Sequence, residues 1–285
     1  MPGTWEVTTS LTSHQRLDVL TWINYLEAHL GREAIDEARR RAVVHATPAQ
    51  HWLRYADAHL AGYAMVSGEL DPSLEMAGGG FDDDLLTRVL EIHPQIDWWT
   101  RGPQARDSGV DLRTLQFLRV DLPVDLEPIP AGALLRIFDP ARDEVAWLEQ
   151  NNAAFASHPE QGAWRRGDLD ARTREPWFDP SGFLVLEIDG VLVASCWTKV
   201  HELYEERFGE IYVVSVHPQY QGRRLGRVMV TQGLETLRRR GVASAGLFVD
   251  DSNLSARALY DSLGFRLVRE DHLTRFTREV RGSSA

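Results

Sequence analysis

Cysteine is almost absent from this chain of 285 residues, because Cys196 is the only one. One cysteine cannot form a disulfide within the chain, and it excludes a zinc-finger arrangement. The histidines His45, His51 and His59 are scattered without a His-x-x-x-His spacing. The sequence therefore predicts a reducing, cytoplasmic environment and no metal site.

Long apolar runs are also missing. The most apolar strip, Phe183–Trp197, is interrupted by Glu187 and Asp189, whereas a membrane helix needs about 20 apolar residues. The first ten residues carry no apolar stretch of the signal-sequence kind, and no Gly-x-Ser-x-Gly motif of a serine hydrolase occurs. We expect a soluble, globular protein without a membrane partner.

Positive charge is in deficit, with 31 Lys and Arg against 42 Asp and Glu and a net charge of −11. Such an acidic chain excludes a generic nucleic-acid partner. Apolar material is plentiful, because 43% of the residues are hydrophobic and nine are tryptophan, which is enough for a sizeable core. The length leaves room for two ordinary domains, and we expect a monomer.

The first half is predicted to form helices followed by a hairpin. Apolar spacing indicates two helices and then two strands, at Leu17–Leu30, Ile35–Val43, Trp52–Tyr55 and Leu60–Val66. Leu122–Pro130 carries three prolines in nine residues, which disfavours a helix or a central strand. We place a domain boundary there, with residues 1–126 as the first domain and residues 131–285 as the second.

The second half is predicted to alternate helices and strands. The expected order is a helix around Val145–Phe155, strands at Phe183–Ile188, Val191–Val200 and Glu210–Val216, a helix at Arg223–Arg240, a strand at Ala245–Val249, a helix at Ser255–Leu263 and a strand from Phe265. The fold class is α/β, and each half is expected to be a mixed, twisted sheet with flanking helices.

A faint internal repeat relates the halves. The hairpin at Asp189 follows the similar hairpin at Asp57 by 132 residues, whereas Gly264 follows the similar Gly109 by 155 residues. The first half therefore lacks 23 residues between its hairpin and its last strand. The second half has a strand, a loop and a long helix in this interval.

The segment Gln221–Arg227 reads Gln-Gly-Arg-Arg-Leu-Gly-Arg and separates a β-branched strand from an amphipathic helix. Free N–H groups at the start of a helix, together with its dipole, form an anion site that suits a pyrophosphate. Arg223, Arg224 and Arg227 add positive charge there. On these residues alone, a solvated basic helix start explains the loop equally well, since short glycine motifs often match by chance.

Four elements in order carry a resemblance to a known family. The strand from Glu210, the Gln221–Arg227 loop with its helix, Asp251-Ser-Asn253 and the run from Ala258 to Phe265 resemble the acetyl-CoA-binding core of the GNAT N-acetyltransferases. The resemblance implies two tandem GNAT-like acyltransferase domains, acetyl-CoA as the co-substrate and no metal.

Further motifs narrow the resemblance to the mycothiol synthase family of tandem GNAT enzymes; they are Asn151–Gly162, Glu175–Pro180, Trp197–His201 and Gly209–Val214. The likeness is good from about Asn151 to Val268 and weak in the first half. It implies transfer of acetyl to the cysteinyl amine of a small thiol precursor, cysteinyl-glucosaminyl-inositol. A GNAT enzyme for another amine, and a non-catalytic acetyl-CoA sensor, are the alternatives.

Two residues match the catalytic positions of the family. A Glu that opens a strand more often faces water, but amine acetylation needs a base near the acyl carbon, and the resemblance assigns that role to Glu210. Tyr260 alone would be a core aromatic. The resemblance makes it the general acid that protonates the departing CoA thiolate.

The cofactor-binding residues follow from the same resemblance. In GNAT folds the strand after the base splays from its neighbour and offers backbone N–H groups to the pantetheine and the thioester carbonyl, and the loop amides take the pyrophosphate. Asn253, an ordinary N-cap residue, faces the pantetheine in that fold. The expected contacts are Val214, Ser215, Val216, Gln221, Gly222, Arg223, Arg224, Leu225, Gly226, Arg227 and Asn253.

Arg224 departs from the family, which has a small Gly at this position. A helical φ is negative, so an Arg is sterically acceptable if the residue belongs to the first turn. We expect that conformation at Arg224, with the amides of Leu225, Gly226 and Arg227 as the surer phosphate donors.

Substrate contacts are also implied by the resemblance. Glu160 lies in a Pro/Gly turn, where a Glu usually decorates the surface, and Lys199 lies in an apolar strand, where a Lys usually points outward. Both match substrate-contacting positions of the mycothiol synthase family, as do Glu210 and Tyr260. Glu33 is a further expected contact that reaches across the domain interface.

The first half is predicted to be catalytically silent. Its counterpart of the phosphate loop, Ser73–Leu86, contains three glycines followed by Asp82, Asp83 and Asp84. Three carboxylates at a helix start repel a pyrophosphate. We expect this half to fold, to bind no acetyl-CoA tightly and to help shape the substrate cleft.

Overall fold

The computed structural model describes residues 3–68, 70–102, 109–156, 162–202 and 207–278. Its first half forms the predicted helices and hairpin, together with four further strands and a further helix before the proline-rich segment. The elements are β1 (Trp5–Thr8), α1 (Ser13–Leu30), α2 (Glu37–Val44), β2 (Gln50–Ala56), β3 (His59–Ser67), β4 (Ser73–Met76), α3 (Asp83–Ile92), β5 (Gln95–Arg101) and β6 (Val110–Asp121).

The second half follows the predicted order and adds a first strand and a short helix. Its elements are β7 (Ala133–Ile137), α4 (Pro140–Ala154), α5 (Arg166–Thr173), β8 (Phe183–Ile188), β9 (Val191–Glu202), β10 (Arg207–Val216), α6 (Leu225–Arg239), β11 (Ser244–Asp250), α7 (Leu254–Ser262) and β12 (Arg266–Thr277). The segment 122–130 carries neither helix nor strand. The mixed α/β class is confirmed; the boundary of the two domains stays a prediction.

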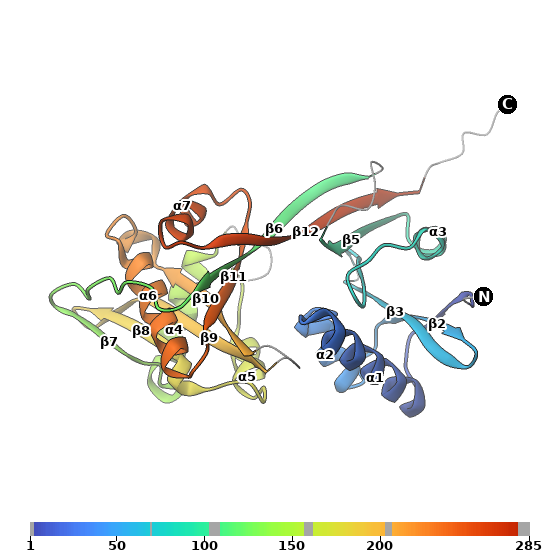
Figure 1. Ribbon diagram of the computed structural model, residues 1–285, viewed down its shortest axis with the longest axis horizontal. Coiled ribbons are helices and arrows are strands. Elements are labelled where there is room, and N and C mark those ends of the chain that lie inside the picture. Colours follow the sequence, from blue (N-terminus) through green and yellow to red (C-terminus); the bar gives the residue numbers. More distant parts are fainter. Residues whose placement is uncertain (1–2, 69, 103–108, 157–161, 203–206, 279–285) are drawn as a thin grey trace.

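All twelve strands form one sheet in the order β1-β2-β3-β4-β5-β12-β6-β11-β10-β9-β8-β7. Strands β6 and β12 run side by side between the two halves (Figure 1). The last strand of the chain, β12, lies between β5 and β6 of the first half, and β6 in turn pairs with β11 of the second half. Each half therefore completes its sheet with a strand from the other half.

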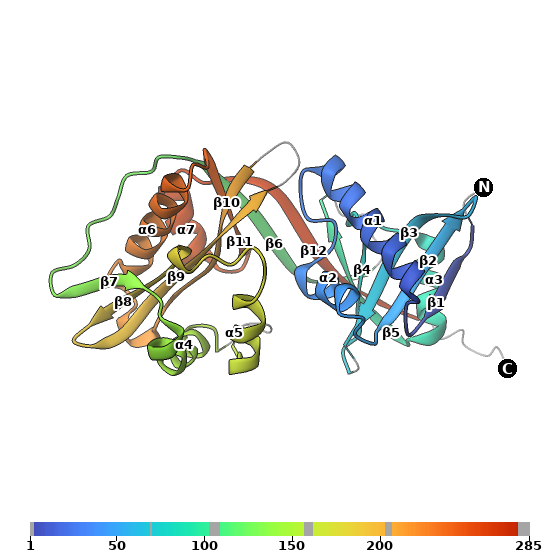
Figure 2. The ribbon, with the colours of Figure 1, turned by 90° about the horizontal axis from the view of Figure 1, so that it is seen from below.

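Helices cover the sheet in both halves (Figure 2). In the second half, α6 buries Met229, Val230 and Leu234 against β9 and β10, and its apolar face explains why the amphipathic pattern formed a helix. On the opposite face, Trp147 of α4 packs edge-on against Trp197 of β9 in an aromatic core. The rigid strand pair β9–β10 is thus held from both sides.

The predicted 23-residue deficit of the first half has a structural explanation. Strand β4 is the counterpart of β10 in the internal repeat and has four residues instead of ten. Helix α3 is the counterpart of α6 and has ten residues instead of fifteen. In addition, β5 and β6 are joined by residues 102–109, whereas β11 and β12 are joined by residues 251–265, which include α7. The first half is shortened at the elements that, in the second half, surround the Gln221–Arg227 loop.

Candidate active site

Strands β10 and β11 separate in the middle of the sheet. They are parallel partners only at Gly209 with Ala245 and at Glu210 with Gly246, while β10 stays paired with β9 as far as Val216. Beyond Glu210, β10 therefore has no strand partner on its β11 side among the described residues. Backbone N–H groups that need a partner are thereby available to a ligand in the gap.

Val214, Ser215 and Val216, the expected pantetheine contacts, lie on β10 beyond this separation. The Ser215 hydroxyl is bonded to the Ser195 hydroxyl of β9 at 3.0 Å and donates to the Gln150 side chain of α4 at 3.0 Å. Because that hydroxyl is already engaged, Ser215 can offer a ligand only its backbone.

The Gln221–Arg227 loop crosses from β10 to the start of α6. The Gln221 side chain donates to the Val216 carbonyl at 3.2 Å, which fastens the loop to the end of β10. Gly222 has a φ of 75°, a left-handed conformation that glycine adopts without strain. Helix α6 begins at Leu225 with no side chain capping its first N–H groups, so these amides remain available for an anion.

The expectation for Arg224 is wrong. Arg224 has a φ of 62° and a ψ of 8°, so it occupies the left-handed region just before the helix rather than the first helical turn. This conformation costs a residue with a Cβ about 1–2 kcal/mol, which explains why the family has Gly there. The Arg is tolerated because its side chain is 71% exposed and finds an acidic partner.

That partner is Glu127, in the segment between the halves. Its carboxylate accepts from the guanidinium groups of Arg224 and Arg227, each at 3.0 Å, and its backbone N–H donates to Thr231 of α6 at 3.1 Å. Arg227 also donates to Ser262 at 2.7 Å. A carboxylate of the connecting segment therefore fixes two arginines of the Gln221–Arg227 loop.

The second part of the site lies where β10 is still paired. Across the β9–β10 ladder, Glu210 is opposite Lys199 and Phe208 is opposite His201. Because side chains alternate along a strand, these four lie on one face of the sheet. His201 Nε2 and Glu210 Oε2 are 2.5 Å apart, and the His201 ring stacks on Phe208 with the ring centroids 4.5 Å apart.

Lys199 is buried, which contradicts the outward orientation that is usual for a strand lysine. Its ammonium donates to Glu33 at 3.0 Å and to Glu37 at 3.3 Å, and it lies 4.8 Å from the centre of the Trp177 ring. Burial acts to lower the pKa of Lys199, but the carboxylates of Glu33, Glu210 and Glu37 outweigh burial and raise it. Lys199 is thus a permanent cation.

Glu33 reaches this site from the first half, and its contact with the substrate stays a prediction. It lies between α1 and α2, and its carboxylate is 3.0 Å from Lys199 and 3.9 Å from His201 Nδ1. Burial acts to raise the pKa of Glu33, whereas the charges of Lys199 and His201 lower it below its usual value. The carboxylate is therefore ionised at neutral pH.

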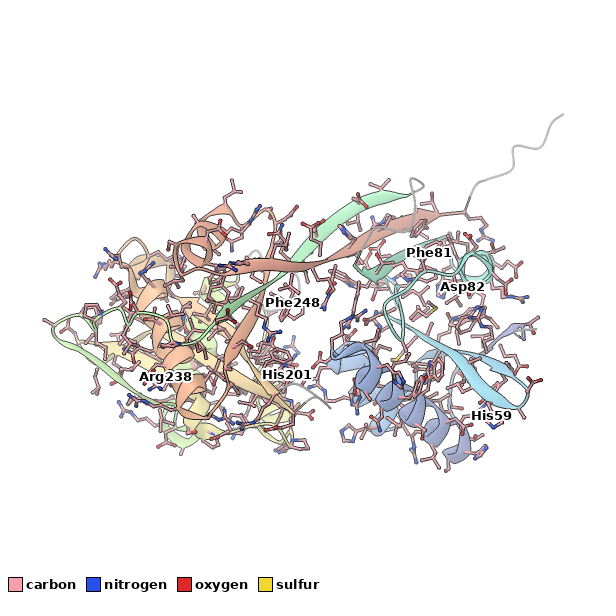
Figure 3. All side chains as sticks on the ribbon, in the orientation of Figure 1. His59, Phe81, Asp82, His201, Arg238 and Phe248 are labelled. Carbon is pink, nitrogen blue, oxygen red and sulfur yellow. The ribbon has the colours of Figure 1, made fainter. Side chains whose placement is uncertain are left out.

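A cavity of about 450 Å³ opens beside these groups, between the halves. Glu33, His201 and Glu210 line it together with three phenylalanines and four arginines. These are Phe117, Phe208, Phe248, Arg32, Arg101, Arg119 and Arg269. The view with side chains shows His201 and Phe248 at the side of the second half that faces the first half (Figure 3). The cavity has the mixed apolar and polar lining of a small-molecule site.

Tyr260 is buried on α7, within the core that surrounds α6. Burial raises the pKa of its phenol, so the hydroxyl keeps its proton at neutral pH, as a general acid requires. Asn253 caps the same helix through a bond from the Ala256 N–H at 3.1 Å. Its contact with pantetheine stays a prediction.

Comparison with known proteins identifies the family. Residues 146–265 match the model of the acetyltransferase (GNAT) family. Mycothiol acetyltransferase of Thermomonospora curvata is 52% identical over 279 residues, 90% of this chain and 91% of that protein, and the one of Streptomyces griseus is 38% identical over 93% of each. The chain belongs to the mycothiol acetyltransferase family. The resemblance inferred from the motifs is confirmed.

Solved structures place this mycothiol acetyltransferase family member among tandem GNAT folds. A GCN5-related N-acetyltransferase of Sphaerobacter thermophilus superposes with a TM-score of 0.67 at 19% identity over 96% of this chain and 95% of the other. A tandem GNAT protein of the clavulanic acid biosynthesis pathway gives 0.66 at 16% identity over 96% and 98%. At such low identity these two support the fold alone.

The remaining predictions for this family member concern Glu160, the acidic residues of the first half, a metal site and a membrane helix. Glu160 lies outside the described residues. In the first half, Asp82 caps α3 and accepts from Arg54 at 2.7 Å, so this acid is used in the fold. Within the described ranges no group of His, Cys, Asp and Glu could hold a metal, and no helix there could span a membrane.

Sequence reasoning missed three functional candidates, namely His201, Glu37 and Glu127. His201 was detectable, because the alternation of Trp197, Lys199 and His201 places all three on one face of a strand. Glu37 contacts Lys199, and Glu127 contacts the Gln221–Arg227 loop, only because distant segments fold together, so no local pattern indicates either residue.

Proposed function

We propose that this chain transfers the acetyl group of acetyl-CoA to the cysteinyl amine of 1-D-myo-inositol 2-(L-cysteinylamino)-2-deoxy-glucopyranoside, the last step of mycothiol biosynthesis. The observation that carries the proposal is the meeting of Glu210 and Lys199 of the second half with Glu33 of the first half beside a cavity. The names of the relatives supply the acceptor.

The site fits acetyl-CoA in two places. Uncapped amides of Leu225, Gly226 and Arg227 at the start of α6 suit the pyrophosphate, and Arg223 adds positive charge. The free edge of β10 beyond Glu210 suits the pantetheine arm and the thioester carbonyl. When bound, acetyl-CoA supplies an activated acyl group to the cavity between the halves.

Residues of the chain then remove a proton from the acceptor amine and donate a proton to the CoA sulfur. A free α-amine has a pKa of about 7.7–8.0, so near neutral pH a base has to remove a proton from much of the bound acceptor. Glu210 accepts it through a water molecule, and Tyr260 supplies a proton to sulfur. Lys199 and Glu33, with Glu160, orient the hydroxyl groups and the amine of the acceptor.

The acceptor is tested by mass spectrometry of cysteinyl-glucosaminyl-inositol incubated with acetyl-CoA and the full chain. One acetyl group on nitrogen is expected, with the Glu210→Gln variant as the control that removes enzymatic transfer. Aminoglycosides and a peptide N-terminus serve as competing acceptors. Preferred acetylation of either competitor would overturn the proposal. A thiol colour reagent is unsuitable because the acceptor carries its own thiol.

The first half is proposed to contribute Glu33 to the cleft and to bind no acetyl-CoA tightly. Its β4 is short, and Asp82 with the neighbouring acids stands at the start of α3. Calorimetry of acetyl-CoA binding is expected to give one tight site per chain, and two equivalent tight sites would refute this. The cytoplasmic location, the monomeric state and the lack of a nucleic-acid partner stay predictions.

A further inference from the structure

We propose that Glu75 of the first half is a positioning residue for the acceptor: its carboxylate fixes the connection between α1 and α2, from which Glu33 reaches Lys199. The inference rests on the proposed function for the contact of Glu33 with the acceptor. It rests on the contacts of this chain for the network that holds Glu33 in place.

Glu75 occupies the position in the first half that Glu210 occupies in the second. Strand β4 is paired with β5 from Ser73 to Glu75, and β10 is paired with β11 at Gly209 and Glu210, both in parallel. In each half the glutamate is thus the last paired residue before the two strands separate. The first half therefore has a carboxylate at the position of the base, although it is predicted to be catalytically silent.

The surroundings of Glu75 show why this carboxylate holds the backbone instead of serving a ligand. Glu75 is only 2% exposed. Its Oε1 accepts from Nε and Nη2 of Arg101 at 2.8 and 2.5 Å, and its Oε2 accepts from the Asp36 backbone N–H at 3.0 Å. A buried carboxylate needs such partners, and bonds that involve a charged group are about twice as strong as neutral ones. Both oxygens of Glu75 are therefore engaged within the first half.

The two partners of Glu75 act on either side of Glu33. Arg101 continues the network, because its Nη1 donates to the Glu33 backbone carbonyl at 2.8 Å. Asp36, three residues after Glu33, is the N-cap residue of α2. One buried carboxylate thus restrains both ends of the segment 33–36.

This segment carries Glu33 toward the second half. Figure 2 shows α2, which follows the segment, on the side of the first half that faces the second half. The Glu33 carboxylate lies 3.0 Å from the Lys199 ammonium and lines the cavity, whereas Glu75 does not line it. A displacement of a binding group by about 1 Å can cost about 10²-fold in rate. Glu75 therefore acts on the acceptor through Glu33, without touching it.

The kinetic test compares Glu75→Gln with the parent. Glutamine has nearly the same size, but one end of its amide only donates, so the bond to Arg101 or the bond from the Asp36 N–H is lost. Expected are a rise in the acceptor KM of about 5- to 20-fold, a kcat within about threefold of the parent, and an unchanged calorimetric affinity for acetyl-CoA. A lower kcat at the parental KM is the result of a purely structural role, and it would overturn the proposal.

A cycle with Glu33→Gln tests whether Glu75 acts through Glu33. In that background Glu75→Gln should raise the acceptor KM by less than about twofold, because the carboxylate that it positions is already gone. Equal rises in both backgrounds would refute the proposal. The matched control is Asp97→Asn on β5, which breaks an ion pair with Arg275 and is expected to keep the parental KM. A rise as large as that of Glu75→Gln would show that the effect is not specific.

Arg101→Lys tests the same network with a second variant. Lysine keeps the positive charge beside Glu75, but its single nitrogen cannot bond both Glu75 and the Glu33 carbonyl. A rise in the acceptor KM is expected in the parent background and not in the Glu33→Gln background. A parental KM, or an equal rise in the two backgrounds, would count against the proposal.

A measurement without substrates separates this proposal from the proposed function. Urea unfolding of Glu33→Gln, Lys199→Met and the double variant gives the coupling between Glu33 and Lys199. When the cycle is repeated in the Glu75→Gln background, the coupling should fall by at least half, because Glu33 is no longer held opposite Lys199. An unchanged coupling would contradict the positioning role even if the chain acetylates the proposed acceptor. A reduced coupling would support it even if the acceptor is another amine.

Discussion

The ion pair between Glu33 and Lys199 joins the two halves at the site, and its strength can be measured by replacing Glu33 with Gln and Lys199 with Met, singly and together. The distance is 3.0 Å, and the side chains are 35% and 7% exposed. Fully buried pairs cost about 3–5 kcal/mol when one partner is removed, and exposed pairs contribute about 0–1 kcal/mol. Because Glu33 is partly hydrated, we expect a coupling of about 2 kcal/mol.

The assay is urea unfolding at pH 7 for the parent, the two single variants and the double variant. Glu33→Gln is expected to be the more damaging single change, since it leaves the buried Lys199 ammonium with Glu37 as its nearest carboxylate. The matched control is the more exposed pair of Asp84 and Arg88 on α3, whose side chains are 54% and 35% exposed and where coupling should be much weaker. Equal coupling in the two cycles would refute the reasoning.

The pH dependence of the coupling gives an independent check. The pKa of Glu33 is lowered in the folded protein, where Lys199 and His201 outweigh the opposing effect of burial, so its contribution is present above about pH 4.3 and is lost as the pH falls through the folded value. The pKa of Lys199 is raised by the carboxylates despite burial, so its contribution is present below about pH 10.4 and is lost as the pH rises through the folded value. The coupling should therefore be constant around neutrality.

Four further predictions follow from the site. Glu210→Gln should lower kcat by about 10²–10⁴ and leave the calorimetric affinity for acetyl-CoA unchanged; a tenfold loss of affinity would show a role in binding. Tyr260→Phe should lower kcat by about 10², because it removes the buried phenol proton, and a parental rate would exclude Tyr260 as the acid. Arg224→Gly should have a free energy of unfolding about 1–2 kcal/mol higher than Arg224→Ala, because only the Ala variant keeps a Cβ in the left-handed conformation; equal free energies of unfolding would show that backbone strain is unimportant. Burial raises the pKa of the Cys196 thiol to about 12, so a thiol reagent at pH 8 should label it only after unfolding.

Most of the fold could be predicted because its signals are local. The hairpin at Asp189-Gly190, the alternation along β9 and the apolar stripe of α6 each depend on residues that are neighbours in the sequence. Small errors lie at the ends of elements, as for α6, which begins at Leu225 rather than Arg223. The first residue of a helix depends on the backbone conformation just before it, and the spacing of apolar residues carries no information about that conformation.

The site was predictable only in part. Glu210 and Lys199 were found through the motifs that carry the family resemblance, and the structure places them opposite each other on one ladder. The left-handed Arg224 was missed because a side chain with a Cβ is a poor indicator of positive φ. Glu127 was missed because its ion pairs join residues about a hundred positions apart.

The exchange of β6 and β12 between the halves has a consequence for how the chain is made. During synthesis the first half emerges first, but the strand that lies between its β5 and β6 is the last strand of the chain. Until then one side of β5 has no partner, and an unpaired edge is where chains associate wrongly. The first half therefore cannot finish folding before the second half is made: the ribosome has to deliver β12 before the strands of the first half are all paired.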